Sequence, residues 1–215
     1  MDPELVVALD ISDIKKAMEL AKSITCETIT LEVGTPLVKA GGVAAVRSIV
    51  EEANGRPVHV DLKTIDFPEK ELTPHLEIGI SSVSMLAIAT DEDIMRGLDF
   101  ASSYDAMLWV STLGYPPSLL DNRVAEISDL GVSSMIAHGM GEPNQAFEDM
   151  IEKAKLIRTS GKNISLCVGG GITMGNIDRL RSIGPSNIII GRSIISSSNP
   201  NDEVDSILNK WRKII

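Results

Sequence analysis

The chain is poor in aromatic residues and in cysteine. It holds two Trp, two Tyr and three Phe among 215 residues, so Val, Ile, Leu and Ala must fill the interior. The two cysteines, Cys26 and Cys167, lie far apart and form no C-x-x-C pair. Because disulfides persist mainly in oxidising compartments, we expect two reduced thiols and a cytoplasmic protein.

Positive charge and long apolar runs are also in short supply. Twenty Lys and Arg face 30 Asp and Glu, a formal net charge of −10. Such a surface repels nucleic acid and anionic lipid, so neither is expected as a partner. No run approaches the roughly 20 apolar residues of a membrane helix, and no basic, then apolar leader pattern opens the chain. An anionic substrate would therefore need a local positive pocket.

Short β-branched runs alternate with longer amphipathic segments along the whole chain. Strands alternating with helices predict parallel pairing, and eight such units predict a single (β/α)8 TIM barrel over residues 1–215. A doubly wound open sheet is the alternative, but ALDISD follows the first strand instead of a G-x-G-x-x-G turn. The expected strands are 5–10, 28–33, 57–62, 81–86, 105–110, 132–137, 164–169 and 187–191.

Helical spacing of apolar residues fills the intervals between these strands. Ser12 or Asp13 is expected to cap the first helix. The last helix begins with acids and ends with bases, as the helix dipole favours. The segments with this spacing are 11–24, 41–53, 91–102, 118–131, 144–161, 172–184 and 201–215.

In a barrel, active sites lie at the carboxyl ends of the strands. The third strand, VHVDLKTID, ends with Asp61, Lys63 and Asp66. Two carboxylates flanking an ammonium form a network that can keep Lys63 charged or tune it as an acid or base. The alternative is a structural ion network at the barrel rim. His59 lies deeper, and we interpret it as a core histidine.

Further charged groups end the first, second and sixth strands. Glu32 ends the strand next to the third, so Glu32 and Asp61 offer two hard oxygen ligands to Mg2+. His138 ends the sixth strand and is a candidate proton shuttle. Asp10 ends the first strand and is expected to accept a hydrogen bond from a substrate hydroxyl or from Lys63.

Glycines end the last two strands, at 169–171 and at Gly191, with Arg192 next in the chain. In barrels a phosphate often lies between these two loops. Glycine lets backbone N–H groups approach an anion closely, and arginine adds a bidentate contact. We therefore predict a phosphate site formed by Gly170, Gly171, Gly191 and Arg192. The alternative is that the glycines serve turns alone.

The segment DLKTID resembles the D-x-K-x-x-D motif of the orotidine-5′-phosphate decarboxylase suprafamily. The similarity extends to VALD, LEVGTPLVKAGG, AHG with the downstream Gln145, VGGGI and IIIGRSI. Orotidylate decarboxylases carry a lysine on the second strand, whereas Glu32 in E-V-G-T-P resembles the branch of 3-hexulose-6-phosphate synthase and 3-keto-L-gulonate-6-phosphate decarboxylase. In that branch this Glu and the first Asp of the motif engage Mg2+.

After the sixth strand, HGMGEPNQ lacks the arginines of the keto-gulonate decarboxylase pattern H-R-S-R-D-A-Q. It is closer to the synthase pattern H-x-G-x-D-x-Q, with Glu142 in place of Asp and a different spacing to Gln145. By contrast, Arg192, and SIISSS after the last strand, are less typical of synthases.

The resemblance implies an aldolase of the 3-hexulose-6-phosphate synthase type. It would condense formaldehyde with D-ribulose 5-phosphate, or run the reverse, through a Mg2+-stabilised enediolate. Lys63, Asp66, His138 and Asp10 would be its catalytic residues. The family also implies a homodimer in which Asp66 reaches across the interface. Two alternatives stay open: a sugar-phosphate or orotidylate decarboxylase, and a non-catalytic phosphosugar-binding protein.

Overall fold

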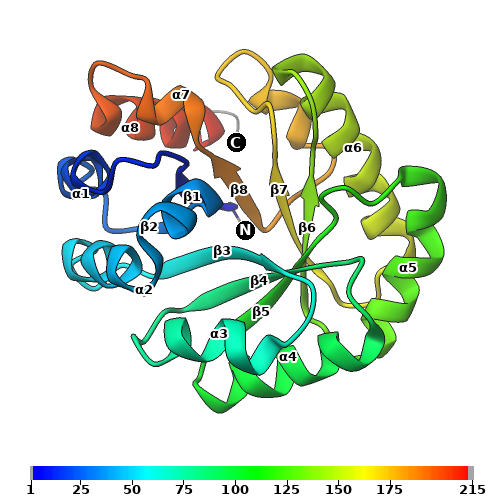
Figure 1. The fold of residues 1–215 in the computed structure, drawn as a ribbon. Helices are drawn as coiled ribbons and strands as arrows, with labels where there is room; N and C mark the ends of the chain where they lie inside the picture. The colour runs from blue at the N-terminus through cyan, green and yellow to red at the C-terminus, as the bar shows by residue number, and fades with distance from the viewer. Residues whose placement is uncertain (1, 213–215) are drawn as a thin grey trace.

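A computed structural model describes residues 2–212, and within them eight parallel strands close into a barrel in the order β1 to β8 (Figure 1). The prediction of a TIM barrel rather than an open sheet is confirmed. Each strand pairs with the next in the sequence, and β8 closes the ring against β1. The strands are β1 Glu4–Leu9, β2 Ile29–Val33, β3 Val58–Thr64, β4 Ser82–Leu86, β5 Met107–Ser111, β6 Ser134–His138, β7 Ser165–Gly169 and β8 Asn187–Ile190.

Helices surround the barrel, and their starts follow from local sequence. Asp13 caps α1 by accepting a hydrogen bond from the Lys16 amide, as expected. Several other helices begin with proline, whose missing N–H costs nothing in the first turn. No helix of the described residues has the length and apolar character needed to cross a membrane. The helices are α1 Ile14–Ser23, α2 Thr35–Glu52, α3 Pro68–Leu76, α4 Asp91–Ser103, α5 Pro117–Asp129, α6 Pro143–Ser160, α7 Arg192–Ile195 and α8 Pro200–Arg212.

The crossover between β7 and β8 corrects one prediction. Residues 172–184 were expected to form a helix, but only a single 3-10 turn forms, over Ile177–Leu180. Asn176 accounts for the difference, because its side chain donates to the Gly171 carbonyl and accepts from the Thr173 amide. These bonds stabilise a turn in place of a first helical turn. The sequence also gave no indication of α3, and α2 begins earlier than predicted, with a kink at Gly42.

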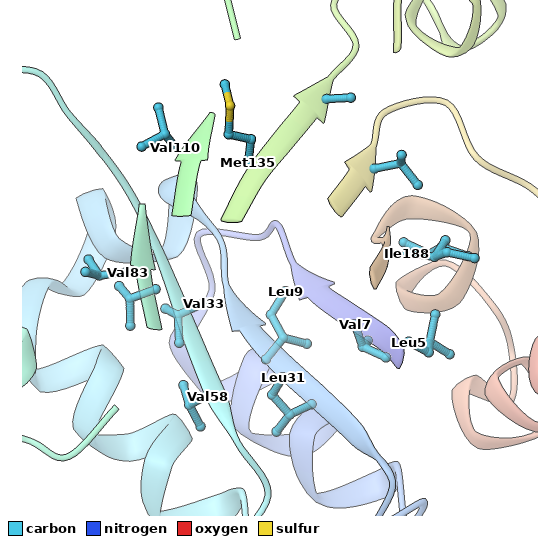
Figure 2. Close-up of a cluster of buried hydrophobic side chains, with 14 of the residues drawn as sticks. Leu5, Val7, Leu9, Leu31, Val33, Val58, Val83, Val110, Met135 and Ile188 are labelled. Atoms are coloured by element: carbon cyan, nitrogen blue, oxygen red, sulfur yellow. The ribbon is translucent and has the colours of Figure 1, made fainter. Parts of the chain in front are cut away.

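Apolar side chains pack on both sides of the strands. The outward face of the sheet packs beneath the helices, as Leu5, Val7 and Leu9 of β1 do beside Leu31 and Val33 of β2 (Figure 2). A smaller cluster fills the barrel interior and consists of Val6, Trp109, Ile136 and Cys167.

His59 is a core residue, as interpreted. It is fully buried, its ring stacks on Trp109 with centroids 4.2 Å apart, and its Nδ1 lies 2.8 Å from Ser82 Oγ. Burial lowers the pKa of His59 to about 4, so the ring is neutral at pH 7.

A bulge interrupts β3 just where its charged residues begin. The pairing with β4 shifts between Val60 and Thr64, and Lys63 adopts a φ of 56°. A left-handed backbone is costly for a residue with a Cβ, so local contacts must hold it. The Lys63 amide donates to Ser84 Oγ at 3.1 Å, which is one such contact. Asp61 and Lys63 nevertheless both line the cavity, while Leu62 packs against the outer core.

Candidate active site

A cavity of about 630 Å³ opens at the carboxyl ends of the strands. Its lining draws together segments that are far apart in the sequence, from β1 through the start of α7. Nine of the ten predicted site residues line it: Asp10, Glu32, Asp61, Lys63, His138, Gly170, Gly171, Gly191 and Arg192.

Asp66 is the predicted site residue that does not line this cavity. It is exposed in the loop between β3 and α3, between Ile65 and Phe67, which are 47% and 58% exposed. Within one chain, Asp66 is therefore separate from the other charged groups.

Asp61 and Lys63 form an ion pair at the centre of the site. Lys63 Nζ also donates to Thr35 Oγ1 at 2.6 Å, and Ser84 Oγ donates to Asp61 Oδ1 at 2.7 Å. Burial alone would oppose ionisation of Asp61, but Lys63, together with these hydrogen bonds, outweighs it and lowers the pKa of Asp61. Asp61 is therefore a carboxylate at neutral pH, with Lys63 held beside it.

Glu32 is buried and has a different electrostatic environment. Burial, followed by the negative charges of Asp61 and Asp10, raises the pKa of Glu32 well above its ordinary value. Its Oε2 has no hydrogen-bond partner among the described residues. A buried carboxylate without a partner is costly, and a bound cation would remove that cost.

Asp10 lies at the cavity mouth between two glycines. A Cβ on Gly34 would overlap Asp10 Oδ1, and one on Gly191 would lie 3.1 Å from Asp10 Oδ2. Loss of solvation, then the charge of Asp61, raises the pKa of Asp10, while Lys63 and Arg192 oppose this. The lack of a side chain at Gly191 therefore leaves room for Asp10. This steric role is separate from the phosphate contact predicted for Gly191.

The donor set is suited to a hard divalent cation. Glu32 offers an unpartnered carboxylate oxygen, and Asp61 offers an ionised carboxylate. Mg2+ commonly takes one or two carboxylates and fills its remaining positions with water and substrate oxygens. Among residues 2–212, no group of three or more His, Cys, Asp or Glu side chains is arranged to hold a metal, so a fully protein-made site is absent there.

His138 ends β6 beside the cavity. Its amide donates to Thr112 Oγ1 at 3.1 Å, and its Nδ1 lies 3.3 Å from Ser111 Oγ. Burial, with the charges of Lys63 and Lys153, lowers the pKa of His138 to about 4, although Asp61 and Asp149 oppose the shift. The imidazole is therefore neutral at pH 7 and is available to accept a proton.

The glycine-rich turn after β7 packs against the start of α6. Gly170 and Gly171 have φ values of 117° and 65°, which favour glycine. A Cβ on Gly170 would press on the Gly139 backbone, and one on Gly171 would overlap the Pro143 carbonyl. These glycines therefore serve packing, and their backbones also line the cavity.

Several hydroxyl groups of the site were missed from the sequence. Thr35 and Ser84 hold the Asp61–Lys63 pair, and Ser111 lies beside His138. Ser193, next to Arg192, has a buried Oγ without a partner among the described residues. Thr35 falls within the E-V-G-T-P segment and Ser193 within IIIGRSI, which were the available signals. Ser84 and Ser111 resemble ordinary strand residues.

The fold and the cavity define a (β/α)8 barrel protein with acids, a lysine, an imidazole and a glycine-rich turn around one polar site. Residues 3–207 match the model of the orotidine 5′-phosphate decarboxylase / HUMPS family, and the chain belongs to this family.

Known relatives are similar over most of the chain, and solved structures share its fold. A 3-hexulose-6-phosphate synthase of Staphylococcus haemolyticus is 26% identical over 197 residues, covering 92% of this chain and 93% of that protein. A crystal structure of 3-hexulose-6-phosphate synthase superposes with a TM-score of 0.85 at 22% identity, covering 95% of this chain and 97% of its own. A 3-keto-L-gulonate-6-phosphate decarboxylase from Vibrio cholerae has the same TM-score at 20% identity, with both chains fully covered. The resemblance expected from DLKTID is confirmed at the level of the family.

Proposed function

We propose that this protein is an aldolase of the 3-hexulose-6-phosphate synthase type, which joins formaldehyde to D-ribulose 5-phosphate or catalyses the reverse. The observation that carries the proposal is Glu32, a buried acid beside the Asp61–Lys63 pair whose Oε2 has no hydrogen-bond partner within residues 2–212. An orotidylate decarboxylase has a lysine at this strand, which would not leave such a site for a cation. The glycines at 139 and 141, where the keto-gulonate decarboxylase pattern has arginines, favour the synthase within the sugar-phosphate branch.

The phosphate of the sugar would bind at the turns after β7 and β8. Backbone N–H groups of Gly170, Gly171 and Gly191 would face the anion, and Arg192 would add a charged contact. This pocket supplies the local positive charge that the acidic surface lacks.

Beside the turn after β7, His138 would accept the proton from C1 of ribulose 5-phosphate, because its imidazole is neutral at pH 7. Lys63 would stabilise the negative charge that develops on the neighbouring oxygen, a fixed charge aimed at the transition state. Asp10 would orient substrate hydroxyls. When bound by Glu32 and Asp61, Mg2+ would supply a Lewis acid for the substrate oxygens.

We further propose a homodimer in which Asp66 acts at the partner's site, since it lies outside its own cavity between two exposed apolar side chains. A cytoplasmic location remains our expectation from the cysteine content.

The test is loss of ribulose 5-phosphate in the presence of formaldehyde. The purified protein should catalyse it with Mg2+, and EDTA or Glu32→Gln should abolish it. Glu51→Gln, an exposed acid on α2, provides the matched control and should leave the rate unchanged. Activity that survives both EDTA and Glu32→Gln would refute the assigned role of the metal.

A decarboxylase is the second candidate, and Arg192 at the cavity favours it because this residue is more typical of the decarboxylases. Orotidylate turnover without added metal, or decarboxylation of a sugar phosphate without formaldehyde, would select this function. Binding of phosphorylated ketoses without any turnover would instead indicate a phosphosugar-binding protein.

A further inference from the structure

A buried lysine lies on α6, outside the cavity lining. Lys153 is 2% exposed, and its Nζ donates to Asp149 Oδ2 at 2.9 Å and to the His138 carbonyl at 3.1 Å. Burying an ammonium group costs free energy unless its partners compensate, and an apolar residue would pack at lower cost. The proposed reaction uses neither Lys153 nor Asp149, so the reason for the pair must lie in what it contacts.

Both members of the pair hold the segment that carries His138. Asp149 Oδ2 accepts a hydrogen bond from the Met140 amide at 2.9 Å as well as from Lys153. The pair therefore fixes the carbonyl of His138 and the amide of Met140, on either side of Gly139.

Gly139 itself is held from two other directions. Its amide donates to the Gly169 carbonyl at 2.8 Å, and a Cβ at this position would overlap the Ala146 carbonyl. Three successive residues are thus fixed at the point where β6 passes into its loop, and this fixes the direction in which the His138 side chain leaves the backbone.

We propose that Lys153 and Asp149 are positioning residues for the proton transfer assigned to His138, an inference that rests on the proposed function. They do not reach the substrate. They hold the backbone on the carboxyl side of His138. Thr112, just after β5, accepts a hydrogen bond from the His138 amide, and Ser111, at the end of β5, lies beside the His138 ring.

The first test compares Lys153→Met with Lys155→Met. Both remove one positive charge from α6, but Lys155 is exposed. Lys153→Met should lower kcat by about 10-fold to 100-fold, the scale expected when a reacting group is displaced by about 1 Å. The fall in kcat should exceed any rise in the KM for ribulose 5-phosphate, since Lys153 bonds to the His138 carbonyl and reaches the turn after β7 only through that loop. Lys155→Met should change neither constant.

A double variant separates positioning from a purely structural role. Lys153→Met alone leaves the Asp149 carboxylate without its cation, and adding Asp149→Asn removes that charge. We expect the double variant to regain thermal stability while kcat stays low. Recovery of kcat together with Tm would overturn the proposal, as would a Lys153→Met variant whose kcat is unchanged.

A substrate-free measurement distinguishes this proposal from the proposed function. The amide resonance of Met140 in a 1H–15N spectrum should move in Lys153→Met and stay in place in Lys155→Met. An unmoved Met140 amide in Lys153→Met overturns the positioning role whatever the activity of the wild type. Absence of formaldehyde-dependent turnover in the wild type, with the amide shift as expected, refutes the function while supporting the contact.

Discussion

At the residue scale, the site depends on hydroxyl groups that place its charges. Ser84 is fully buried on β4; its Oγ donates to Asp61 Oδ1 and accepts from the Lys63 amide in the bulge. One side chain therefore supports both the orientation of a carboxylate and a left-handed backbone. Such groups are invisible to charge-based sequence reasoning, because a serine on a strand has many ordinary explanations.

Ser84→Ala should impair both stability and activity. Loss of two buried hydrogen bonds should lower the free energy of unfolding by about 1–3 kcal/mol. Because Asp61 and Lys63 lose a shared support, kcat/KM should fall by about tenfold or more. Urea unfolding and steady-state kinetics check these values. Ser103→Ala, at an exposed serine that donates to the Phe100 carbonyl, is the control and should behave as wild type.

His59 should give the protein an acid-sensitive stability. Its pKa is about 4 in the folded protein and near the ordinary 6.5 when unfolded. Above pH 6.5 the ring is neutral in both states; as pH falls from 6.5 to 4, only the unfolded chain takes up the proton. The free energy of unfolding should therefore decrease, by about 3 kcal/mol at the low end for this ring.

Urea titrations at pH 7 and pH 4.5 in wild type and His59→Gln check this expectation. Glu32 has a raised pKa and acts in the opposite direction, so only the difference between the two proteins isolates His59. The variant should lose less stability on acidification than the wild type. Equal losses would contradict the assigned pKa.

At the element scale, the loops at the carboxyl ends of the strands interlock. The turn after β7 presses on the start of α6, which in turn packs against the loop after β6. The turn after β7, where we propose that phosphate binds, and the loop that carries His138 are thus one packed unit rather than two independent loops.

Gly171→Ala tests this interlock. A Cβ at 171 would overlap the Pro143 carbonyl, and its φ of 65° is unfavourable for alanine, so stability should fall by about 1–3 kcal/mol. Displacement of the turn should also raise KM for the sugar phosphate by about tenfold, the equivalent of one lost charge-assisted hydrogen bond. Gly175→Ala, in the same loop, has a nearest contact of 3.6 Å and should be neutral. Equal effects of the two substitutions would argue against the interlock.

Strand positions could be predicted from the sequence because β-branched runs separated by helical spacing leave few other arrangements. The barrel map then placed Asp10, Glu32, Asp61 and His138 at one rim. The bulge at Lys63 could not be predicted, since it depends on a contact with Ser84 on a neighbouring strand. The helix expected at 172–184 was wrong because the side chain of Asn176 bonds to nearby backbone groups instead.

At the scale of the whole molecule, exposed apolar residues lie near the rim of the site. Ile65 and Phe67 flank Asp66, and Ile88 in the loop after the neighbouring strand β4 is 61% exposed. Apolar groups of this size left in water favour association. If a second copy of the chain covered these side chains, Asp66 would reach the partner's cavity, whereas it does not line the cavity of its own chain.

Phe67→Asp should therefore dissociate the proposed dimer. Loss of a buried aromatic contact weakens association by about 2 kcal/mol or more, and the inserted carboxylate adds a desolvation cost. Sedimentation velocity should show a shift from dimer to monomer, with a parallel loss of activity. Met107→Asp changes an exposed apolar residue at the opposite end of the barrel and should leave the dimer intact. A wild-type protein that sediments as a monomer would refute the shared site.

We propose that this cavity forms a carbon–carbon bond between formaldehyde and a pentulose phosphate. The most direct measurement is a 13C NMR time course with 13C-formaldehyde, ribulose 5-phosphate and Mg2+. We predict that the label enters a six-carbon phosphosugar, and that Glu32→Gln prevents this. If the label stays in formaldehyde while the same preparation decarboxylates orotidylate or a keto-sugar phosphate, the claim is contradicted.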